Sequence, residues 1–171
     1  MYQITDQYLP NFSVKLIHGY LVSVSFIDEQ VGRLIDHLQS LGQTENTVIC
    51  LWGDHGWYLG DHGMFCKHTN YEQTTGSPLI LVAPDIVPAG TPINVPTEFV
   101  DIYPTLCDLT DFEPNLQLEG TSLLPIIENS TSSVKLVSMS QYLRCYNKQD
   151  VMSYACRDHR YRYVEWVQEE I

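Results

Sequence analysis

The sequence predicts an α/β fold: part of a mostly parallel central sheet flanked by helices, followed by the start of a small antiparallel subdomain. Three observations lead to this class. A long amphipathic segment precedes the apolar run "NTVICLW", a glycine-rich polar loop follows that run, and the chain after residue 134 alternates apolar with polar residues. Helix, buried strand and polar loop in succession are typical of α/β folds, whereas alternation favours antiparallel strands.

The first predicted element is a helix over residues 14–41. Apolar residues recur every three or four positions along it, which predicts one buried stripe. Asn11 or Ser13 can cap the start of the helix, and Gly42 is a plausible end.

Two apolar runs predict buried strands, at residues 46–52 and 77–85. The first is apolar on both faces, which is usual for a central strand of a parallel sheet. The second, "SPLILVAPD", is ended by Pro84. A proline-rich connection then leads to two predicted short helices, within residues 97–110 and 119–129.

The polar stretch "NSTSS" separates two predicted domains. Residues 1–128 form the larger α/β part, and residues 134–171 begin the small antiparallel subdomain. Within the latter, segments 134–144 and 151–166 alternate and are rich in aromatic residues, which predicts an antiparallel pair.

Charge and cysteine content narrow the classes of partner. The chain has 171 residues, with 9 Lys and Arg against 21 Asp and Glu, a formal net charge of −12. This balance disfavours nucleic acid and anionic membranes, which need a cationic surface. No apolar run approaches the roughly 18 residues of a membrane span. Five cysteines without CxxC spacing predict no disulfide framework.

The stretch "GDHGWYLGDHGMFCKHTN", residues 53–70, carries the candidate chemistry. Ligand sites in open α/β sheets lie beyond the carboxyl ends of strands, where this loop begins. Gly53 and Gly56 permit a turn that brings Asp54 and His55 to one cation. By ligand type alone this pair favours zinc, iron or manganese over calcium. The alternative is a loop in which the carboxylate caps a helix and the imidazole donates to a carbonyl.

A second polar turn, "GDHG", and then Lys67 follow in the same loop. A lysine beside a metal-ligand turn suits an oxyanion. With these elements, residues 53–85 resemble the metal-binding stretch of sulfatases, particularly the iduronate-2-sulfatase branch of this family in the alkaline phosphatase superfamily. The shared pattern is DHG, a Trp, a G-[DE]-H-G turn, a lysine and an xPLI strand. The segments "SVSFIDEQVGRLIDHL", "EFVDIYPTLCDLT", "LEGTSLLPII" and "SYACRDHRYRYVEW" also resemble sulfatase segments.

The resemblance implies roles for five residues of the loop. Asp54 and His55 match one pair of ligands to a divalent cation, which is calcium in this family. Lys67 matches a catalytic lysine that contacts the sulfate. Trp57 either lines the substrate pocket or packs as an ordinary aromatic, and His62 either contacts the substrate or braces the loop. The implied substrate is a sulfated small molecule or glycan, and the implied location is extracytoplasmic: periplasmic, secreted or lysosomal.

The expected nucleophile is absent from the chain. Sulfatases use a formylglycine made from a cysteine in C-x-[PA]-x-R, and "CRDHR" at residues 156–160 has Asp158 where Pro or Ala is needed. We therefore expect the C-terminal portion of a sulfatase, inactive alone, that pairs with its N-terminal half or with itself. The alternatives are a phosphatase or phosphodiesterase of the same superfamily and a non-catalytic fragment.

Overall fold

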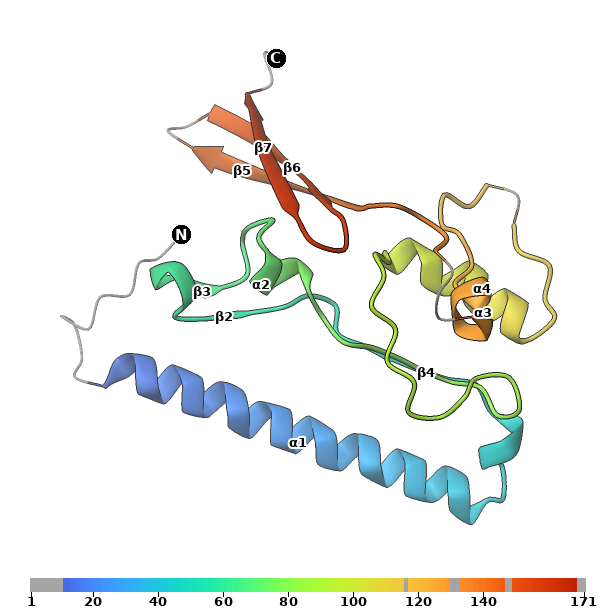
Figure 1. The fold of residues 1–171 in the computed structure, drawn as a ribbon. Helices are drawn as coiled ribbons and strands as arrows, with labels where there is room; N and C mark the ends of the chain where they lie inside the picture. The colour runs from blue at the N-terminus through green and yellow to red at the C-terminus, as the bar shows by residue number, and fades with distance from the viewer. Residues whose placement is uncertain (1–10, 116, 130–132, 147–148, 169–171) are drawn as a thin grey trace.

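The computed structural model describes residues 11–115, 117–129, 133–146 and 149–168 (Figure 1). The helices are α1 (Phe12–Ser40), α2 (Glu72–Thr75), α3 (Ile102–Leu109) and α4 (Leu124–Glu128), with short 3-10 turns at Thr44–Asn46, Asp61–Gly63 and Phe99–Asp101. The strands are β1 (Ile49–Trp52), β2 (Tyr58–Leu59), β3 (Phe65–Cys66), β4 (Leu79–Val82), β5 (Ser138–Tyr146), β6 (Gln149–Arg157) and β7 (Arg162–Gln168).

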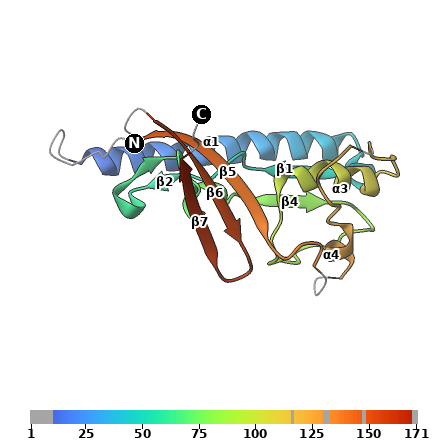
Figure 2. The ribbon, with the colours of Figure 1, turned by 90° about the horizontal axis from the view of Figure 1, so that it is seen from above.

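The elements form layers around the two-stranded ribbon of β1 and β4. Helix α1 runs along the length of the molecule on one side of this ribbon (Figures 1 and 2). Helices α3 and α4 and the sheet β5–β7 lie on its other side. The β2–β3 hairpin and α2 lie beyond one end of the ribbon, between α1 and the C-terminal sheet (Figure 1).

Helix α1 forms where the apolar spacing predicts it. It ends at Ser40, and Gly42 follows with φ 64°, a left-handed conformation that glycine adopts without strain. The predicted buried stripe is wrong for the described chain, because no residue of α1 is buried and Leu34 is 71% exposed. Amphipathic spacing indicates which side of a helix can be covered, and the described segments cover this side only in part, leaving Ile17, Val31 and Leu38 half-buried.

The predicted parallel sheet is also wrong for the described residues. β1 pairs with β4 in antiparallel register, with Ile49 opposite Val82 and Trp52 opposite Leu79. Parallel neighbours need a crossover to the opposite end of the sheet. Here the chain between the strands folds into the β2–β3 hairpin and α2, and it returns to the end that it left. The strands are half-buried to exposed, rather than buried on both faces.

This connection closes at its base. The backbone N–H of Gly53 donates to the carbonyl oxygen of Pro78 at 3.0 Å, directly beyond the last strand pair. Residues 53–78 therefore leave and re-enter the fold at the same point.

The C-terminal sheet is antiparallel, as predicted, but has three strands where we expected a pair. β6 lies between β5 and β7, with Ser138 opposite Arg157 and Arg157 opposite Arg162. "CRDHR" forms the end of β6 and the turn into β7. In that turn the Asp158 carboxylate accepts backbone N–H bonds from Tyr161 and from Arg160, which lower its pKa.

A buried ion cluster joins this sheet to the helical layer. The Asp101 side chain is fully buried, and Lys135 Nζ donates to its Oδ1 at 2.8 Å and contacts a carboxylate oxygen of Glu98. Burial opposes the charge of Lys135, but hydrogen bonds to the two carboxylates outweigh burial and raise its pKa. The cluster fixes the segment leading into β5 against the start of α3.

The apolar core nearest to the ribbon is small. Leu123, Ile126 and Ile127 of the α4 region are buried and pack against Leu79 and Leu81 of the β4 strand. Both short helices expected in this region are present as α3 and α4. The division into residues 1–128 and 134–171 stays a prediction. Within the described part of the chain, no helix is both long and apolar enough to span a bilayer.

Candidate active site

Asp54 and His55 begin the loop immediately after β1. The His55 Nδ1 atom lies 2.8 Å from the carbonyl oxygen of Gly56, which can only accept a hydrogen bond. In the neutral ring this contact places the proton on Nδ1 and the lone pair on Nε2. That Nε2 atom lies 3.2 Å from the Asp54 carboxylate oxygen Oδ2. Two electron-rich atoms therefore face each other, which is the arrangement that a cation stabilises.

Lys67 reaches the same point from the far side of the loop. Its Nζ atom contacts His55 Nε2, so an ammonium group, an imidazole lone pair and a carboxylate meet. The Asp54 side chain is 82% exposed, whereas that of His55 is 27% exposed. The carboxylate thus remains open to a ligand from outside this part of the chain.

The donor set fits a divalent cation but is incomplete. Asp54 supplies a hard oxygen and His55 a nitrogen, whereas calcium takes about 6–8 oxygen ligands. Among the described residues no group of three or more His, Cys, Asp and Glu is placed to hold a metal ion. The pair can therefore contribute to a cation site whose other ligands come from elsewhere.

Gly56 allows the turn that brings these groups together. A Cβ atom at this position would lie 2.2 Å from the carbonyl oxygen of Gln73 and 2.5 Å from that of Gly76. The backbone N–H of Gly56 also donates to the Thr74 carbonyl at 2.9 Å. The DHG turn is therefore packed directly on α2, with no room for a side chain.

Trp57 and His62 lie outside the cavity described below. The Trp57 ring stacks on His55 at 6.0 Å and on Tyr20 at 6.4 Å. His62 lies edge-on to the rings of Tyr58 and Tyr71, and its Nε2 is 3.4 Å from Gln73 Nε2. In this arrangement Trp57 supports His55, and His62 braces the loop. The substrate roles of both residues remain predictions.

A cavity of about 780 Å³ opens beside the Asp54, His55 and Lys67 group. Its walls are the loop, residues 94–100 and the inner face of the C-terminal sheet. The sequence analysis missed the cavity residues that come from the sheet, from α2 and from the segment just before α2. They include His68, Asn70, Glu72, Tyr142, Arg157 and Arg162. The alternating pattern of the strands signals that such side chains share a face, but not that this face meets the loop.

His68 shows how closely the two parts meet. Its Nδ1 atom lies 2.7 Å from the hydroxyl of Tyr142 on β5, and the two ring centroids are 6.0 Å apart. No motif in the sequence singles out His68. In the structure this residue, the immediate neighbour of Lys67, contacts the C-terminal sheet.

Two family models match the chain. The family model described as "Sulfatase" matches residues 2–112, and that described as "N-sulphoglucosamine sulphohydrolase, C-terminal" matches residues 60–170. The chain belongs to the sulfatase family, within the alkaline phosphatase superfamily.

The individual relatives are much longer than the chain. A sulfatase from Formosa agariphila is 33% identical over 152 residues, which are 89% of this chain and 28% of the relative. Iduronate 2-sulfatase from Homo sapiens is 34% identical over 118 residues, 69% of this chain and 20% of the relative. The structure of BT4656 in complex with its substrate D-glucosamine-2-N,6-O-disulfate matches with a TM-score of 0.78 and 30% identity, covering 86% of this chain and 32% of that one.

Proposed function

We propose that this chain is the part of a sulfatase that holds one pair of metal ligands and the sulfate-binding lysine, in an enzyme that hydrolyses a sulfate ester of a sugar. The observation that carries the proposal is the convergence of Asp54, His55 and Lys67 at the mouth of one cavity. A compact ammonium with three donors beside a cation site suits a group whose negative charge is spread over several oxygens.

The chain's own residues bind and orient the substrate. Lys67 would donate to a sulfate oxygen and offset charge that develops on it. Asp54 and His55 would help to hold a divalent cation, calcium in this proposal, which polarises the sulfate when bound. The nucleophile, a formylglycine, would come from residues outside this chain, since none of the five cysteines lies in C-x-[PA]-x-R.

A sugar sulfate is the substrate class that the comparisons favour. BT4656 was solved with a glucosamine that carries N- and O-sulfate groups. The described cavity is large enough for a ligand of that class and is lined by side chains that can donate and accept hydrogen bonds. An extracytoplasmic location and pairing with the N-terminal part of a sulfatase complete the proposal. A phosphatase or phosphodiesterase is the alternative within the superfamily, and the two family matches favour the sulfatase.

The test uses the full-length gene product, because the chain covers 20% to 32% of the relatives described above. Release of inorganic sulfate from D-glucosamine-2-N,6-O-disulfate and from 4-nitrocatechol sulfate is measured beside release of phosphate from 4-nitrophenyl phosphate. We expect sulfate release that needs a divalent cation. Phosphate release without sulfate release would favour the alternative, and activity toward neither would favour a non-catalytic protein.

A further inference from the structure

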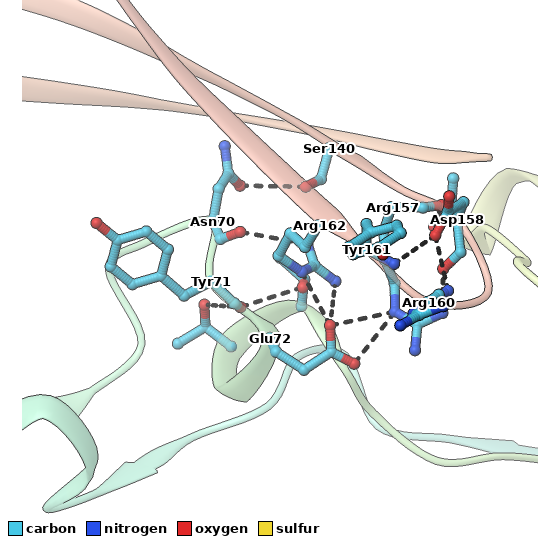
Figure 3. Close-up of polar contacts among 12 residues, drawn as sticks. Asn70, Tyr71, Glu72, Ser140, Arg157, Asp158, Arg160, Tyr161 and Arg162 are labelled. Atoms are coloured by element: carbon cyan, nitrogen blue, oxygen red, sulfur yellow. Dashed lines mark hydrogen bonds and ion pairs between the residues drawn. The ribbon is translucent and has the colours of Figure 1, made fainter.

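The segment that follows Lys67 is fastened to the C-terminal sheet by a carboxylate shared between two arginines (Figure 3). Glu72, the first residue of α2, accepts hydrogen bonds from Arg157 Nε at 3.2 and 3.3 Å and from Arg162 Nε at 2.9 Å. The Nη2 atom of Arg162 also lies 2.7 Å from the same carboxylate. The two arginines lie opposite each other across β6 and β7, so one side chain from the loop clamps both strands.

Asn70 makes a second fastening, two residues closer to Lys67. Its side-chain amide donates to the backbone oxygen and the hydroxyl of Ser153, at 2.8 and 3.0 Å, and its Oδ1 accepts from Ser140 at 3.3 Å. Its backbone oxygen also accepts from Arg162 NH1 at 3.3 Å. Asn70 is only 2% exposed, so these bonds are shielded from water.

The turn between Lys67 and Glu72 is held internally as well. Thr69 is 4% exposed, its N–H donates to the Lys67 carbonyl at 2.8 Å, and its hydroxyl pairs with that of Tyr58 at 2.9 Å. Thr74 of α2 donates to the Thr69 carbonyl at 2.8 Å. These hydrogen bonds link α2 to the backbone that carries Lys67, so a displacement of α2 would be passed to Lys67 through a short turn.

The charge of the Glu72 carboxylate also favours its pairing with the two arginines. Partial burial opposes its ionisation, but hydrogen bonds and attraction from Arg162 and Arg157 outweigh burial and lower the Glu72 pKa. At neutral pH the carboxylate is charged and compensates two guanidinium groups that line the same cavity as Lys67. Neither arginine is then free to draw the sulfate away from the lysine.

We propose that Glu72 is a positioning residue: clamped by Arg157 and Arg162, it fixes the Lys67 segment on the C-terminal sheet and so holds the Lys67 ammonium at the sulfate position. This inference rests on the proposed function, because it assigns Glu72 an effect through Lys67. It also makes the C-terminal sheet a part of the catalytic geometry, although the sheet supplies no reacting group.

The test is a double-mutant cycle in the full-length gene product, with Glu72→Gln, Lys67→Ala and both together. Glu72→Gln keeps the shape of the side chain and removes its charge. Small misplacements of a binding group can lower rates by up to about a hundredfold, so we expect kcat/KM to fall about tenfold and the inhibition constant of inorganic sulfate to rise by a similar factor. In the Lys67→Ala background the same change should alter kcat/KM by less than about twofold.

Two further variants separate positioning from general stability. Glu72→Asp keeps the charge and should recover part of the loss. Glu165→Gln removes a glutamate from the exposed face of β7 and should leave kcat/KM and the sulfate inhibition constant unchanged. If Glu72→Gln fails to fold, Arg157→Gln, which removes the more exposed of the two arginines, replaces it in the cycle.

The outcomes distinguish failure of the positioning role from failure of the proposed function. Effects of Glu72→Gln and Lys67→Ala that multiply in the double variant would overturn the positioning role and leave the sulfatase proposal intact. An active Glu72→Gln variant with wild-type kinetics would do the same. An inactive wild type, or a Lys67→Ala variant with wild-type activity, would overturn both.

Discussion

Lys67 Nζ contacts the Nε2 atom of His55, the ring nitrogen opposite the one that donates to Gly56. The same Nε2 atom lies 3.2 Å from the Asp54 carboxylate oxygen Oδ2, so this imidazole nitrogen is approached by an ammonium and by a carboxylate. In the proposed sulfatase, a cation held by Asp54 and His55 would replace this contact, and the Lys67 ammonium would be available to donate to a sulfate oxygen. Metal binding and substrate binding would then meet at one lysine.

Replacing Lys67 should reduce catalysis far more than stability. In the full-length gene product, Lys67→Ala removes a preorganised donor, a change that typically costs about 10²–10³ in rate. The measurement is kcat/KM on one sulfate ester beside a thermal melt of each protein. A drop below about threefold with an unchanged melt would remove Lys67 from the site, because a surface lysine changes stability by less than about 0.5 kcal/mol.

Metal removal should abolish activity of the full-length gene product, and calcium should restore it. Asp54→Asn removes a charged ligand and should raise the calcium concentration needed for half-maximal activity by at least about tenfold, since ligand charge sets calcium affinity. Calorimetry on residues 1–171 alone should show only weak calcium binding. Sub-micromolar affinity of this chain would mean that its two identified ligands are joined by others.

Lys135→Met should destabilise the protein strongly. It leaves the fully buried Asp101 carboxylate and that of Glu98 without their cation, and removing one partner of a buried pair costs about 3–5 kcal/mol. Denaturant unfolding of the full-length gene product measures this loss. Lys15→Met on the exposed surface of α1 is the control, expected to lie within about 0.5 kcal/mol of wild type. Equal effects of the two variants would contradict the buried cluster.

Gly56→Ala should lower stability by about 1–3 kcal/mol, because the added Cβ forces two backbone carbonyls of the α2 region to move. It should also lower activity, since the displaced turn carries His55. Gly32→Ala on exposed α1, where a Cβ meets nothing within 4 Å, should instead stabilise by up to about 1 kcal/mol. Paired thermal melts compare the two alanines, and a neutral Gly56→Ala would show that α2 does not enclose the DHG turn.

The stability contributed by Glu72 should depend on pH. Because its pKa is lower in the folded protein than in the unfolded chain, the contribution is present above the ordinary glutamate pKa of about 4.3 and is lost as pH falls through the lowered value. The difference in melting temperature between wild type and Glu72→Gln should therefore be largest near neutral pH and shrink on acidification. A difference that stays constant across this range would mean that the ion pairs with Arg157 and Arg162 contribute nothing measurable.

Local sequence patterns predicted the helices and strands well, but they predicted the pairing of the strands less well. Apolar spacing identified α1, and uninterrupted apolar runs identified the strands β1 and β4. These patterns could not give the antiparallel pairing of β1 with β4, since both arrangements accept the same apolar residues. Likewise, the loop motif pointed to Asp54, His55 and Lys67, which the structure brings together.

The cavity residues that come from the C-terminal sheet had no sequence motif that predicted them. Arg157 and Arg162 are separated from Glu72 by more than eighty residues, and a salt bridge across that distance leaves no local pattern. The motif "CRDHR" drew attention to Arg157 only as part of a false nucleophile signature. The pairing of Arg157 with Glu72 is visible only in the structure, where β6 and β7 lie against α2.

The hydrogen bond between Gly53 and Pro78 closes residues 53–78 into a loop whose two ends meet at one point of the ribbon. A change in the length or composition of this loop therefore need not shift the register of β1 against β4. A loop grafted from another sulfatase would still have to form contacts with the C-terminal sheet, where Ser153, Arg157 and Arg162 now bond to this loop. We therefore expect that transplanting this loop between relatives exchanges substrate preference when the residues at these three sheet positions are transferred with it. Transfer of the loop alone should fail.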